Sequence, residues 1–285
     1  LGVTQPAVTK AVARLEKDLE VELFDRRRRP ALLTEEAVVL LKDVLACQHS
    51  LEKTAEFMQS RSYLKPVYRI GVIEGLSKSL MPHLIKSLQP DASEIVTQIG
   101  PSLVLVEKLV RGELDFAFTT AAYDEVHGLY RAKLYEEESL VLMPKSVAAK
   151  RNSWTWFQLQ FCGIPFLHFA REGGVGRIND AYLSLQNIKT PSRIEVDSTG
   201  IMTALIAQGM GWTVGSPLTL IQNMELIDEI TAIPIPPPGL QRSLYLVCRE
   251  DKSDEIRRMF VSLTREMMQV YVVPLFEEVK RRGGR

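Results

Sequence analysis

Hydroxyl side chains stand at the start of several segments with helical spacing in the C-terminal part of the chain. Ser77, Ser102 and the pair Ser198 and Thr199 each occupy such a start. The first N–H groups of a helix have no partner inside the helix, and they attract anions. These residues therefore predict anion binding where helix starts meet. For any single one of them, capping of its own helix explains the hydroxyl equally well.

Two further groups are expected to face the same place. Thr119 and Thr120 directly follow an apolar run at 114–118, and Phe169 ends another run at 164–169. Both runs predict strands, and ligands of α/β folds bind in the crevice beyond the carboxyl ends of strands. We therefore expect a cleft lined by hydroxyls and one aromatic ring. Such a lining suits a small carboxylate or an amino-acid-like molecule.

A second kind of chemistry stands near the N-terminus. Arg26, Arg27, Arg28 and Arg29 form an unbroken run of four positive charges. Residues 1–34 hold seven basic and five acidic side chains, a balance of +2, so the remaining 251 residues carry −2. A local basic cluster in a chain of zero net charge can still attract a polyanion, although such runs also occur as plain solvated turns.

Patterns typical of catalysis are missing from the sequence. No nucleophile with a matching base, no carboxylate dyad and no metal cluster has a recognisable spacing, and the four histidines lie far apart. The segment 173–177, Gly-Gly-Val-Gly-Arg, has the glycines of a phosphate loop but lacks its Lys-Ser/Thr ending. It predicts a turn into a helix that begins at Ile178. The sequence therefore favours a binding protein, without metal or cofactor, over an enzyme.

Length and composition are those of a soluble protein of about two domains. The 285 residues are 46% hydrophobic and 25% charged, with 35 basic and 35 acidic side chains. The three cysteines are widely spaced and provide no disulfide framework, which fits a reducing compartment. No apolar run approaches the roughly 18 residues of a membrane span, and no signal peptide opens the sequence. We therefore expect a cytoplasmic protein without a membrane partner.

The N-terminal residues predict two helices around a turn. Thr4 suits an N-cap and Pro6 suits a first helical turn, and apolar residues follow at helical spacing. Pro30 interrupts the pattern, which places the arginine run in a turn. From Thr34 to about residue 59 the chain contains neither Gly nor Pro, and it predicts one long helix.

The long helix carries one apolar stripe. Its members alternate steps of four and three residues, which is the spacing of a coiled-coil seam. They are Ala37, Leu41, Val44, Gln48, Leu51, Ala55 and Met58, with Gln48 as the polar member that could fix the register. A long helix beside a small basic module has little else to pack against, so the stripe predicts a dimer. The alternative is a helix packed on its own domain.

A different pattern begins after a hinge at residues 61–68. Apolar runs alternate with helical segments, which predicts a mostly parallel sheet covered by helices. The strands are expected at 69–73, 95–99 and 114–118, and the helices at 76–88 and 103–110. A second unit repeats the alternation over 164–214, and a closing helix covers 254–272. The prolines of 233–238 confine that segment to a sheet edge or a connection. The basic tail, 280–285, is expected to be solvated and disordered.

The N-terminal residues also carry the most specific motif of the chain. Leu1-Gly2-Val3-Thr4-Gln5-Pro6-Ala7-Val8-Thr9-Lys10 is followed by Leu15-Glu16, Val21-Glu22-Leu23-Phe24-Asp25-Arg26 and Leu33-Thr34. This pattern and its spacing resemble the winged helix-turn-helix of the LysR-type transcriptional regulators. Three later segments resemble the effector domain of the same family. They are Arg69-Ile70-Gly71 with Leu80-Met81-Pro82, Gly112-Glu113-Leu114-Asp115-Phe116-Ala117-Phe118, and Ala207-Gln208-Gly209-Met210-Gly211-Trp212.

The resemblance implies an α/β architecture in three parts. A winged helix-turn-helix occupies residues 1–34, a linker helix for dimerisation occupies 35–60, and an effector-binding domain follows the hinge over 69–285. That domain has two lobes like those of periplasmic binding proteins. Lobe I is expected to contain 69–142 and 243–285, and lobe II to contain 143–242. The resemblance further implies homotetramers made as dimers of dimers.

One departure from the family pattern bears on DNA binding. Leu1 corresponds to a position near the end of the second helix of the family's DNA-reading head. The first helix and most of the second are therefore absent from this sequence, and the core of the head is incomplete. We expect the chain as given to bind DNA weakly.

The resemblance places the helix that begins near Thr4 in the major groove of double-stranded DNA. Gln pairs bidentately with adenine, Lys and Arg contact guanine or phosphate, and Thr hydroxyls contact phosphate more often. The arginine run would form the wing and neutralise phosphates. The residues expected at DNA are Thr4, Gln5, Pro6, Thr9, Lys10, Arg14, Arg26, Arg27, Arg28 and Arg29. The alternative is an ordinary solvated helix face.

The family's effector contacts correspond to the loop 75–77 and to Ser102 in this sequence. Together with the hydroxyls described above, the expected effector residues are Gly75, Leu76, Ser77, Ser102, Thr119, Thr120, Phe169, Ser198 and Thr199. The sequence thus predicts a DNA-binding regulator switched by a small molecule. The competing hypothesis is a small-molecule binding protein of the same two-lobed fold without a DNA function.

Overall fold

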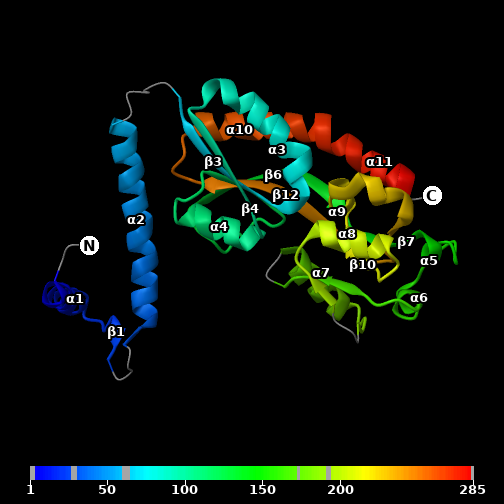
Figure 1. Cartoon of the computed structure of the whole chain (residues 1–285), viewed down its shortest axis with the longest axis horizontal. Coiled ribbons are helices and arrows are strands. Elements are labelled where there is room, and N and C mark those ends of the chain that lie inside the picture. The colour runs from blue at the N-terminus through cyan, green and yellow to red at the C-terminus, as the bar shows by residue number, and fades with distance from the viewer. Residues whose placement is uncertain (1–3, 27–30, 60–64, 172–173, 191–193, 284–285) are drawn as a thin grey trace. The chain divides into compact units, whose positions relative to one another are not determined.

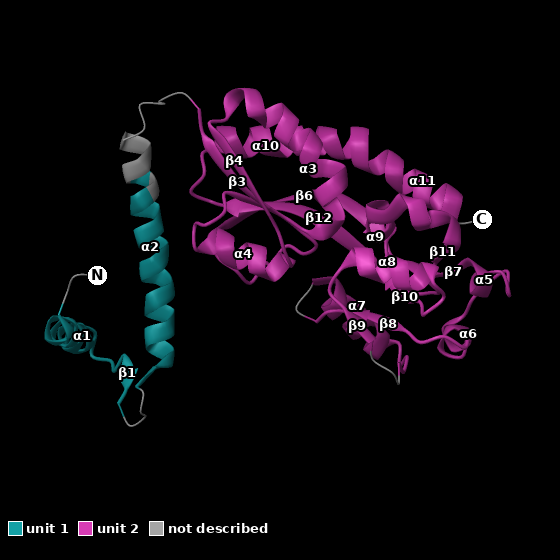
Figure 2. Ribbon diagram, in the orientation of Figure 1, with its two compact units in different colours: residues 1–63 teal, residues 64–285 magenta. Residues whose placement is uncertain are grey.

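The computed structural model describes residues 4–26, 31–59, 65–171, 174–190 and 194–283, with backbone alone for 53 and 55–59. The chain divides into two compact units, residues 1–63 and residues 64–285 (Figure 2).

The N-terminal unit begins with α1 (Gln5–Leu19). Thr4 precedes this helix in an extended conformation, and Pro6 lies in its first turn, as the sequence predicts. The helix ends at Glu20, whose φ of 56° is left-handed. A short hairpin follows, in which β1 (Phe24–Asp25) pairs antiparallel with β2 (Leu32–Leu33). Residues 27–30, which include the predicted Arg27, Arg28 and Arg29, lie outside the described residues.

The helix α2 (Glu35–Gln59) completes the unit. The Thr34 hydroxyl accepts the Ala37 N–H at 3.2 Å and donates to the Glu22 carbonyl at 2.7 Å, so the cap also ties the helix to the hairpin. Ala37 is buried at this junction. The prediction that it belongs to the coiled-coil seam is therefore wrong for this residue. Leu41, Val44 and Leu51 are exposed on α2, while the side chains of Ala55 and Met58 lie outside the description.

The first lobe of the C-terminal unit is built on a five-stranded sheet (Figure 1). In spatial order its strands are β4 (Glu94–Ile99), β3 (Val67–Val72), β5 (Phe116–Thr119), β12 (Gln241–Arg249) and β6 (Leu129–Glu138). The first three strands are parallel, whereas β12 runs antiparallel to both of its neighbours. The sheet carries α3 (Glu74–Leu88) and α10 (Asp254–Met267), which pack on each other, and also α4 (Ser102–Val110). A single 3₁₀ turn, Gln89–Asp91, follows α3.

The second lobe is built on two small sheets. One has the order β10 (Thr213–Gly215), β7 (Leu140–Pro144) and β11 (Ile230–Pro234), all antiparallel, and the other pairs β8 (Leu167–Phe169) in parallel with β9 (Ile194–Val196). Its helices are α5 (Lys145–Ala148), α6 (Trp156–Gln160), α7 (Gly174–Leu185), α8 (Thr199–Ala207), α9 (Pro217–Leu220) and the 3₁₀ segment Ile221–Glu229. β11 is an edge strand, which agrees with the restriction that the prolines impose. The lobes are joined by the passages from β6 to β7 and from β11 to β12 (Figure 1).

The C-terminal helices differ from the expected closing helix. After α10, a π-helical turn, Met268–Val272, leads into α11 (Val273–Gly283). α11 packs on β11 and α9, so residues 273–283 lie with the second lobe rather than with the first. Val279 and Gly283 are buried, and Arg282 contacts Asp228 at 2.8 Å. The predicted disordered tail is therefore wrong for residues 280–283, which form the last turn of α11 with Gly283 packed against Ala232.

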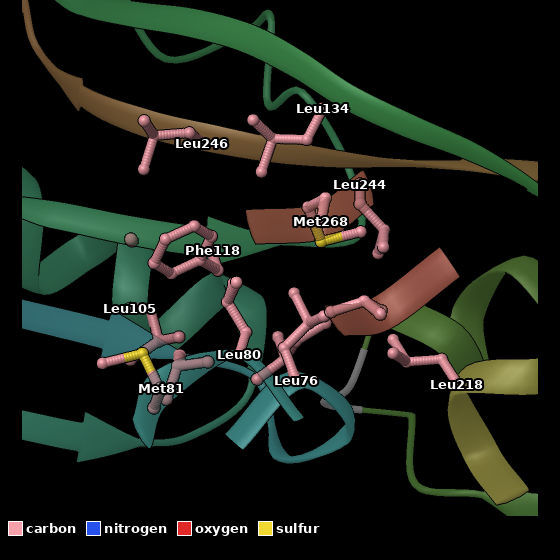
Figure 3. Packing of buried hydrophobic residues seen from close by; sticks show 14 of the residues in the cluster. Leu76, Leu80, Met81, Leu105, Phe118, Leu134, Leu218, Leu244, Leu246 and Met268 are labelled. Carbon is pink, nitrogen blue, oxygen red and sulfur yellow. The ribbon is translucent and has the colours of Figure 1, made fainter. Parts of the chain in front are cut away.

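Two apolar cores hold this unit together. The larger one gathers side chains from α3, β5, β12 and the π-helical turn, and Leu218 of α9 reaches its edge (Figure 3). The smaller one surrounds Trp212, with Val141, Leu159 and Leu183 among its members. Both cores pack against the bodies of helices, so they fix the positions of the helix starts that face the space between the lobes.

Candidate functional site

A cleft of about 600 Å³ opens between the two lobes. Its walls contain the first residues of four helices, Glu74 of α3, Ser102 of α4, Gly174 of α7 and Thr199 of α8. Helix starts bring partial positive charge and free N–H groups, so their convergence favours a ligand with an anionic group.

Ser102 and Thr120 form the deepest polar pair in this wall. Ser102 is 2% exposed, and its Oγ accepts the Thr120 N–H at 3.1 Å and lies 3.3 Å from the Thr120 Oγ1. The N-cap of α4 is Pro101 and not Ser102, and it provides no side-chain cap. The Ser102 hydroxyl is therefore directed across to β5 and does not cap its own helix, which removes the simplest competing explanation for this residue.

Tyr123 lies buried behind the same pair. Burial raises the pKa of its hydroxyl, while the nearby charge of Arg177 and a hydrogen bond with Ser102 act in the opposite direction. The phenol therefore remains a neutral group beside Ser102.

The start of α7 approaches Thr120 closely because it is made of glycines. A Cβ at Gly174 would lie 2.6 Å from the Thr120 Oγ1, and a Cβ at Gly176 would lie 2.2 Å from the Ala170 carbonyl oxygen. The sequence predicted a turn here and a helix from Ile178. The structure corrects this, because α7 begins at Gly174 and the glycines allow its first turn to lie against β5 and β8.

The start of α8 is occupied by a carboxylate from the other lobe. Ser198 caps α8, with its Oγ accepting the N–H groups of Gly200 and Ile201. Glu74 Oε1 accepts the Ser198 hydroxyl at 2.8 Å, and Glu74 Oε2 accepts the Thr199 N–H at 2.6 Å. A side-chain carboxylate thus already fills the anion-attracting end of this helix.

Arg242 of β12 is a buried cation that also lines the cleft. Its Nε lies 2.5 Å from the Glu137 Oε1, and its Nη2 donates to the Ser216 hydroxyl. The side chains of Arg242 and Glu137 are 6% and 1% exposed. Such a pair is fixed in place by its partners, because an unpaired charge at this depth would be very unfavourable.

The structure brings most of the predicted effector residues together. Gly75, Ser102, Thr120, Phe169, Ser198 and Thr199 line the cleft. Three others do not. Leu76 belongs to the apolar core, Ser77 donates to the Glu74 carbonyl within α3, and Thr119 is fully buried and donates to the Ala121 carbonyl. Reasoning from sequence missed Glu74, Gly174, Asp197 and Arg242, which also line the cleft.

Six of the residues predicted to contact DNA lie on or next to the exposed helix α1. Thr4, Gln5, Pro6, Thr9, Lys10 and Arg14 are all exposed on or next to α1. The Thr9 hydroxyl donates to the Gln5 carbonyl at 3.0 Å, and Arg14 lies 3.7 Å from Asp18 with both side chains largely in solvent. Weak, solvated contacts of this kind leave the polar groups available to a partner.

Arg26 differs from its neighbours because it is engaged within the unit. Its Nη2 lies 2.6 Å from the Glu16 Oε2, and the Glu16 Oε1 accepts the N–H groups of Leu23 and Phe24. Glu16 therefore joins α1 to the base of the hairpin, and Arg26 neutralises that carboxylate. This is a structural role in addition to the predicted contact with phosphate.

Within the described residues, no helix combines the length and the apolar character that crossing a membrane requires. Two family models match the chain. The model described as the LysR substrate binding domain matches residues 62–269, and the model described as the bacterial regulatory helix-turn-helix protein, lysR family, matches residues 1–38.

Two transcriptional regulators are among the relatives of the chain. The uncharacterized HTH-type transcriptional regulator YybE of Bacillus subtilis (strain 168) is 27% identical over 286 residues, which cover 98% of this chain and 92% of the relative. The transcriptional activator protein LysR of Escherichia coli (strain K12) is 26% identical over 227 residues, which cover 78% of this chain and 71% of the relative.

Solved structures share the fold. A full-length OxyR variant from Pseudomonas aeruginosa has a TM-score of 0.61 at 20% identity, covering 95% of this chain and 90% of that one. CbnR, a LysR family transcriptional regulator, has a TM-score of 0.59 at 16% identity, covering 93% of this chain and 90% of that one. At these identities the likeness concerns the fold alone.

Proposed function

The chain belongs to the LysR family of transcriptional regulators, and on that premise we propose that a small molecule bound in the cleft between the lobes controls how it acts at DNA. The observation that carries this proposal is the convergence of four helix starts and the buried Ser102–Thr120 pair on one cleft of about 600 Å³. A ligand switches a protein only if it binds one conformation better than another. A site lined from both lobes has that property, because its shape changes when the lobes move.

The proposed effector contacts are the lining residues Gly75, Ser102, Thr120, Phe169, Ser198 and Thr199, to which the structure adds Glu74, Gly174 and Arg242. Hydroxyls, helix N–H groups and one ring support a small carboxylate or an amino-acid-like effector. The helix-turn-helix match at residues 1–38 favours the regulator over a binding protein without a DNA function.

Replacement of Ser102 by Trp tests the proposed pocket. The indole would fill the space beside Thr120 and Gly174, so we expect loss of the thermal stabilisation that small carboxylates or amino acids give to the wild-type chain. DNA binding without effector should be unchanged. Thr264→Ala, which removes a hydroxyl buried in α10 away from the cleft, serves as a control. Retained stabilisation by ligand in the Ser102→Trp variant would place the effector elsewhere.

We further propose that α1 lies in the major groove. Gln5 and Lys10 would read base edges, Thr4, Thr9 and Arg14 would contact phosphates or bases, and Pro6 would set the start of the helix. Arg26 and the following Arg27, Arg28 and Arg29 would form the phosphate-binding wing. The combined replacement of Arg27 and Arg28 by Ala should weaken binding at all DNA sequences and flatten the dependence of log K on log salt by about two. Fluorescence anisotropy on the DNA upstream of its own gene, across a salt series, measures both quantities.

We also propose that α2 forms a homodimer and that two dimers form a homotetramer. The exposed apolar side chains of Leu41, Val44 and Leu51 support the dimer, and two reading heads at a fixed spacing would recognise two half-sites. A regulator of transcription works where the DNA is, so we place the protein in the cytoplasm.

A further inference from the structure

The carboxylate at the start of α8 bears on the class of effector, and the inference drawn from it rests on the effector site proposed above. Glu74 is the first residue of α3 in the first lobe, whereas Ser198 and Thr199 belong to the second lobe. Its two oxygens accept one hydroxyl and one backbone N–H at 2.8 Å and 2.6 Å. Glu74 thus occupies, from within the chain, the place where a carboxylate of a ligand would otherwise bind α8.

The charges that line the cleft also disfavour a carboxylate of a ligand at the start of α8. Among the described residues that line it, the ionisable ones are Glu74, Asp197 and Arg242, whose charges sum to −1. Arg242 is already neutralised by Glu137, so the acidic side chains dominate the field near α8. Asp197 directly precedes Ser198 in the chain, which places both carboxylates beside the start of the same helix. A second anion at this end would meet like charges at short range.

Among the described residues that line the opposite end of the cleft, none is a carboxylate. Ser102 and Gly174 begin α4 and α7 on either side of Thr120, and α4 has no side-chain cap. At the α8 end, the buried Thr199 Oγ1 has no hydrogen-bond partner among the described residues. The described part of the cleft therefore offers helix N–H groups at one end and carboxylates at the other.

We propose that Glu74 is a specificity-determining residue that makes the cleft select an effector with both a carboxylate and an ammonium group. The carboxylate of the effector lies at the starts of α4 and α7, and its ammonium group contacts Glu74 and Asp197. Glu74 also excludes dicarboxylates of similar size, because its own carboxylate occupies the hydrogen-bond donors at the start of α8.

The test compares matched ligands on the full chain. Each of the twenty proteinogenic amino acids is titrated beside the 2-hydroxy acid of the same carbon skeleton, and affinities are measured by thermal shift and calorimetry. We expect at least one amino acid to bind the wild-type chain, with an affinity at least tenfold higher than that of its 2-hydroxy acid.

Variants of Glu74 identify the cause of this preference. Glu74→Gln keeps the size and removes the charge, so the preference should fall at least tenfold and binding of a dicarboxylate such as succinate should improve. Glu74→Asp keeps the charge and should retain most of the preference. Glu107→Gln makes the same charge change on the exposed face of α4, away from the cleft. It should change the affinity for neither the amino acid nor the dicarboxylate.

The outcomes separate this inference from the proposed function. If 2-hydroxy acids bind the wild-type chain as tightly as amino acids do, or if Glu74→Gln leaves the preference intact, the role of Glu74 is wrong while the pocket stands. Absence of binding by every amino acid up to 10 mM also overturns it. If the preferred amino acid still binds the Ser102→Trp variant, the proposed pocket itself is wrong.

Discussion

The N-terminal and C-terminal units differ in where their apolar side chains lie. Among the described side chains of the N-terminal unit, Leu23 and Ala37 are the buried apolar ones, and α1 buries no residue. Val8, Leu15 and Leu19 lie exposed along one side of α1, and Leu41, Val44 and Leu51 lie exposed on α2. The C-terminal unit has two apolar cores of its own.

This difference separates two uses of an amphipathic helix. In the C-terminal unit the apolar face of a helix is covered by the same chain, so the helix serves as a frame for the cleft. In the N-terminal unit the apolar faces of α1 and α2 are exposed, and they are available to contact another molecule. We expect this unit to obtain its stability from partners and the other unit to obtain it from its own packing.

Ion pairs of the C-terminal unit differ in burial, and the largest expected effect follows from that difference. Arg242→Ala would leave the Glu137 carboxylate buried without its partner, which we expect to destabilise the C-terminal unit by about 3–5 kcal/mol. Urea unfolding followed by circular dichroism measures this loss. Arg249→Ala, on the same strand but paired with the more exposed Asp251, should lose less than about 1 kcal/mol. Equal losses in both variants would contradict the contrast.

Packing gives the next effect. Leu80 is fully buried in the core beside α3, so Leu80→Ala should cost about 2–5 kcal/mol through lost burial and an added cavity. Leu19 is the same residue type on α1 but is exposed, and Leu19→Ala should change stability by no more than about 0.5 kcal/mol. The two variants are compared in the same urea titration. A large loss for Leu19→Ala would mean that α1 packs on a surface of its own chain.

The same contrast explains which elements the sequence could predict. Strands β3, β4 and β5 and helices α3 and α4 were predicted because each alternates or repeats apolar residues over its own length. β6 was missed. It reads Leu-Tyr-Arg-Ala-Lys-Leu-Tyr-Glu-Glu-Glu, and it contains Glu137, a buried carboxylate whose partner Arg242 lies far away in the chain. A charge at a buried position hides the alternation, and its partner is not visible from local sequence.

The candidate site follows the same rule. Ser102, Ser198 and Thr199 were found because a hydroxyl at a helix start is a local signal. Glu74 and Arg242 acquire their roles from contacts with Thr199 and Glu137, across the fold. Gly174 was assigned to a turn because glycine disfavours a helix, but close packing of α7 against Thr120 overrides that propensity. The predicted site therefore differs from the observed one mainly at residues whose role depends on a partner far away in the sequence.

Association is the third prediction, and it tests whether the exposed face of α2 has a partner. Leu51 is 71% exposed, so Leu51→Glu should leave the fold of the chain unchanged. If α2 forms the dimer, the buried charge should separate it and halve the mass measured by light scattering at micromolar concentration. Lys42→Glu makes a charge change on the same helix outside the proposed stripe and should keep the mass. An unchanged mass for Leu51→Glu would exclude Leu51 from the interface.

Thiol reactivity compares the units without a mutation. Cys47 is exposed on α2, whereas Cys248 is buried in β12 and burial raises the pKa of its thiol to about 11. At pH 8 we expect iodoacetamide to modify Cys47 at least 100-fold faster than Cys248, with the sites identified by mass spectrometry. The difference should vanish in urea. Because the pKa of Cys248 is raised in the folded state, its contribution to stability is complete below about pH 8.5 and is lost as the pH rises toward 11.

The smallest expected effect concerns the base of the hairpin. Arg26 is 64% exposed, so loss of its contact with Glu16 in Arg26→Ala should cost only about 0.2–1 kcal/mol and less at high salt. Glu16→Ala should cost more, because the N–H groups of Leu23 and Phe24 then lose their acceptor. Amide hydrogen exchange at Leu23 and Phe24 distinguishes the two, with clear acceleration expected in Glu16→Ala alone. Similar acceleration in Arg26→Ala would show that the guanidinium, and not the carboxylate, holds the hairpin on α1.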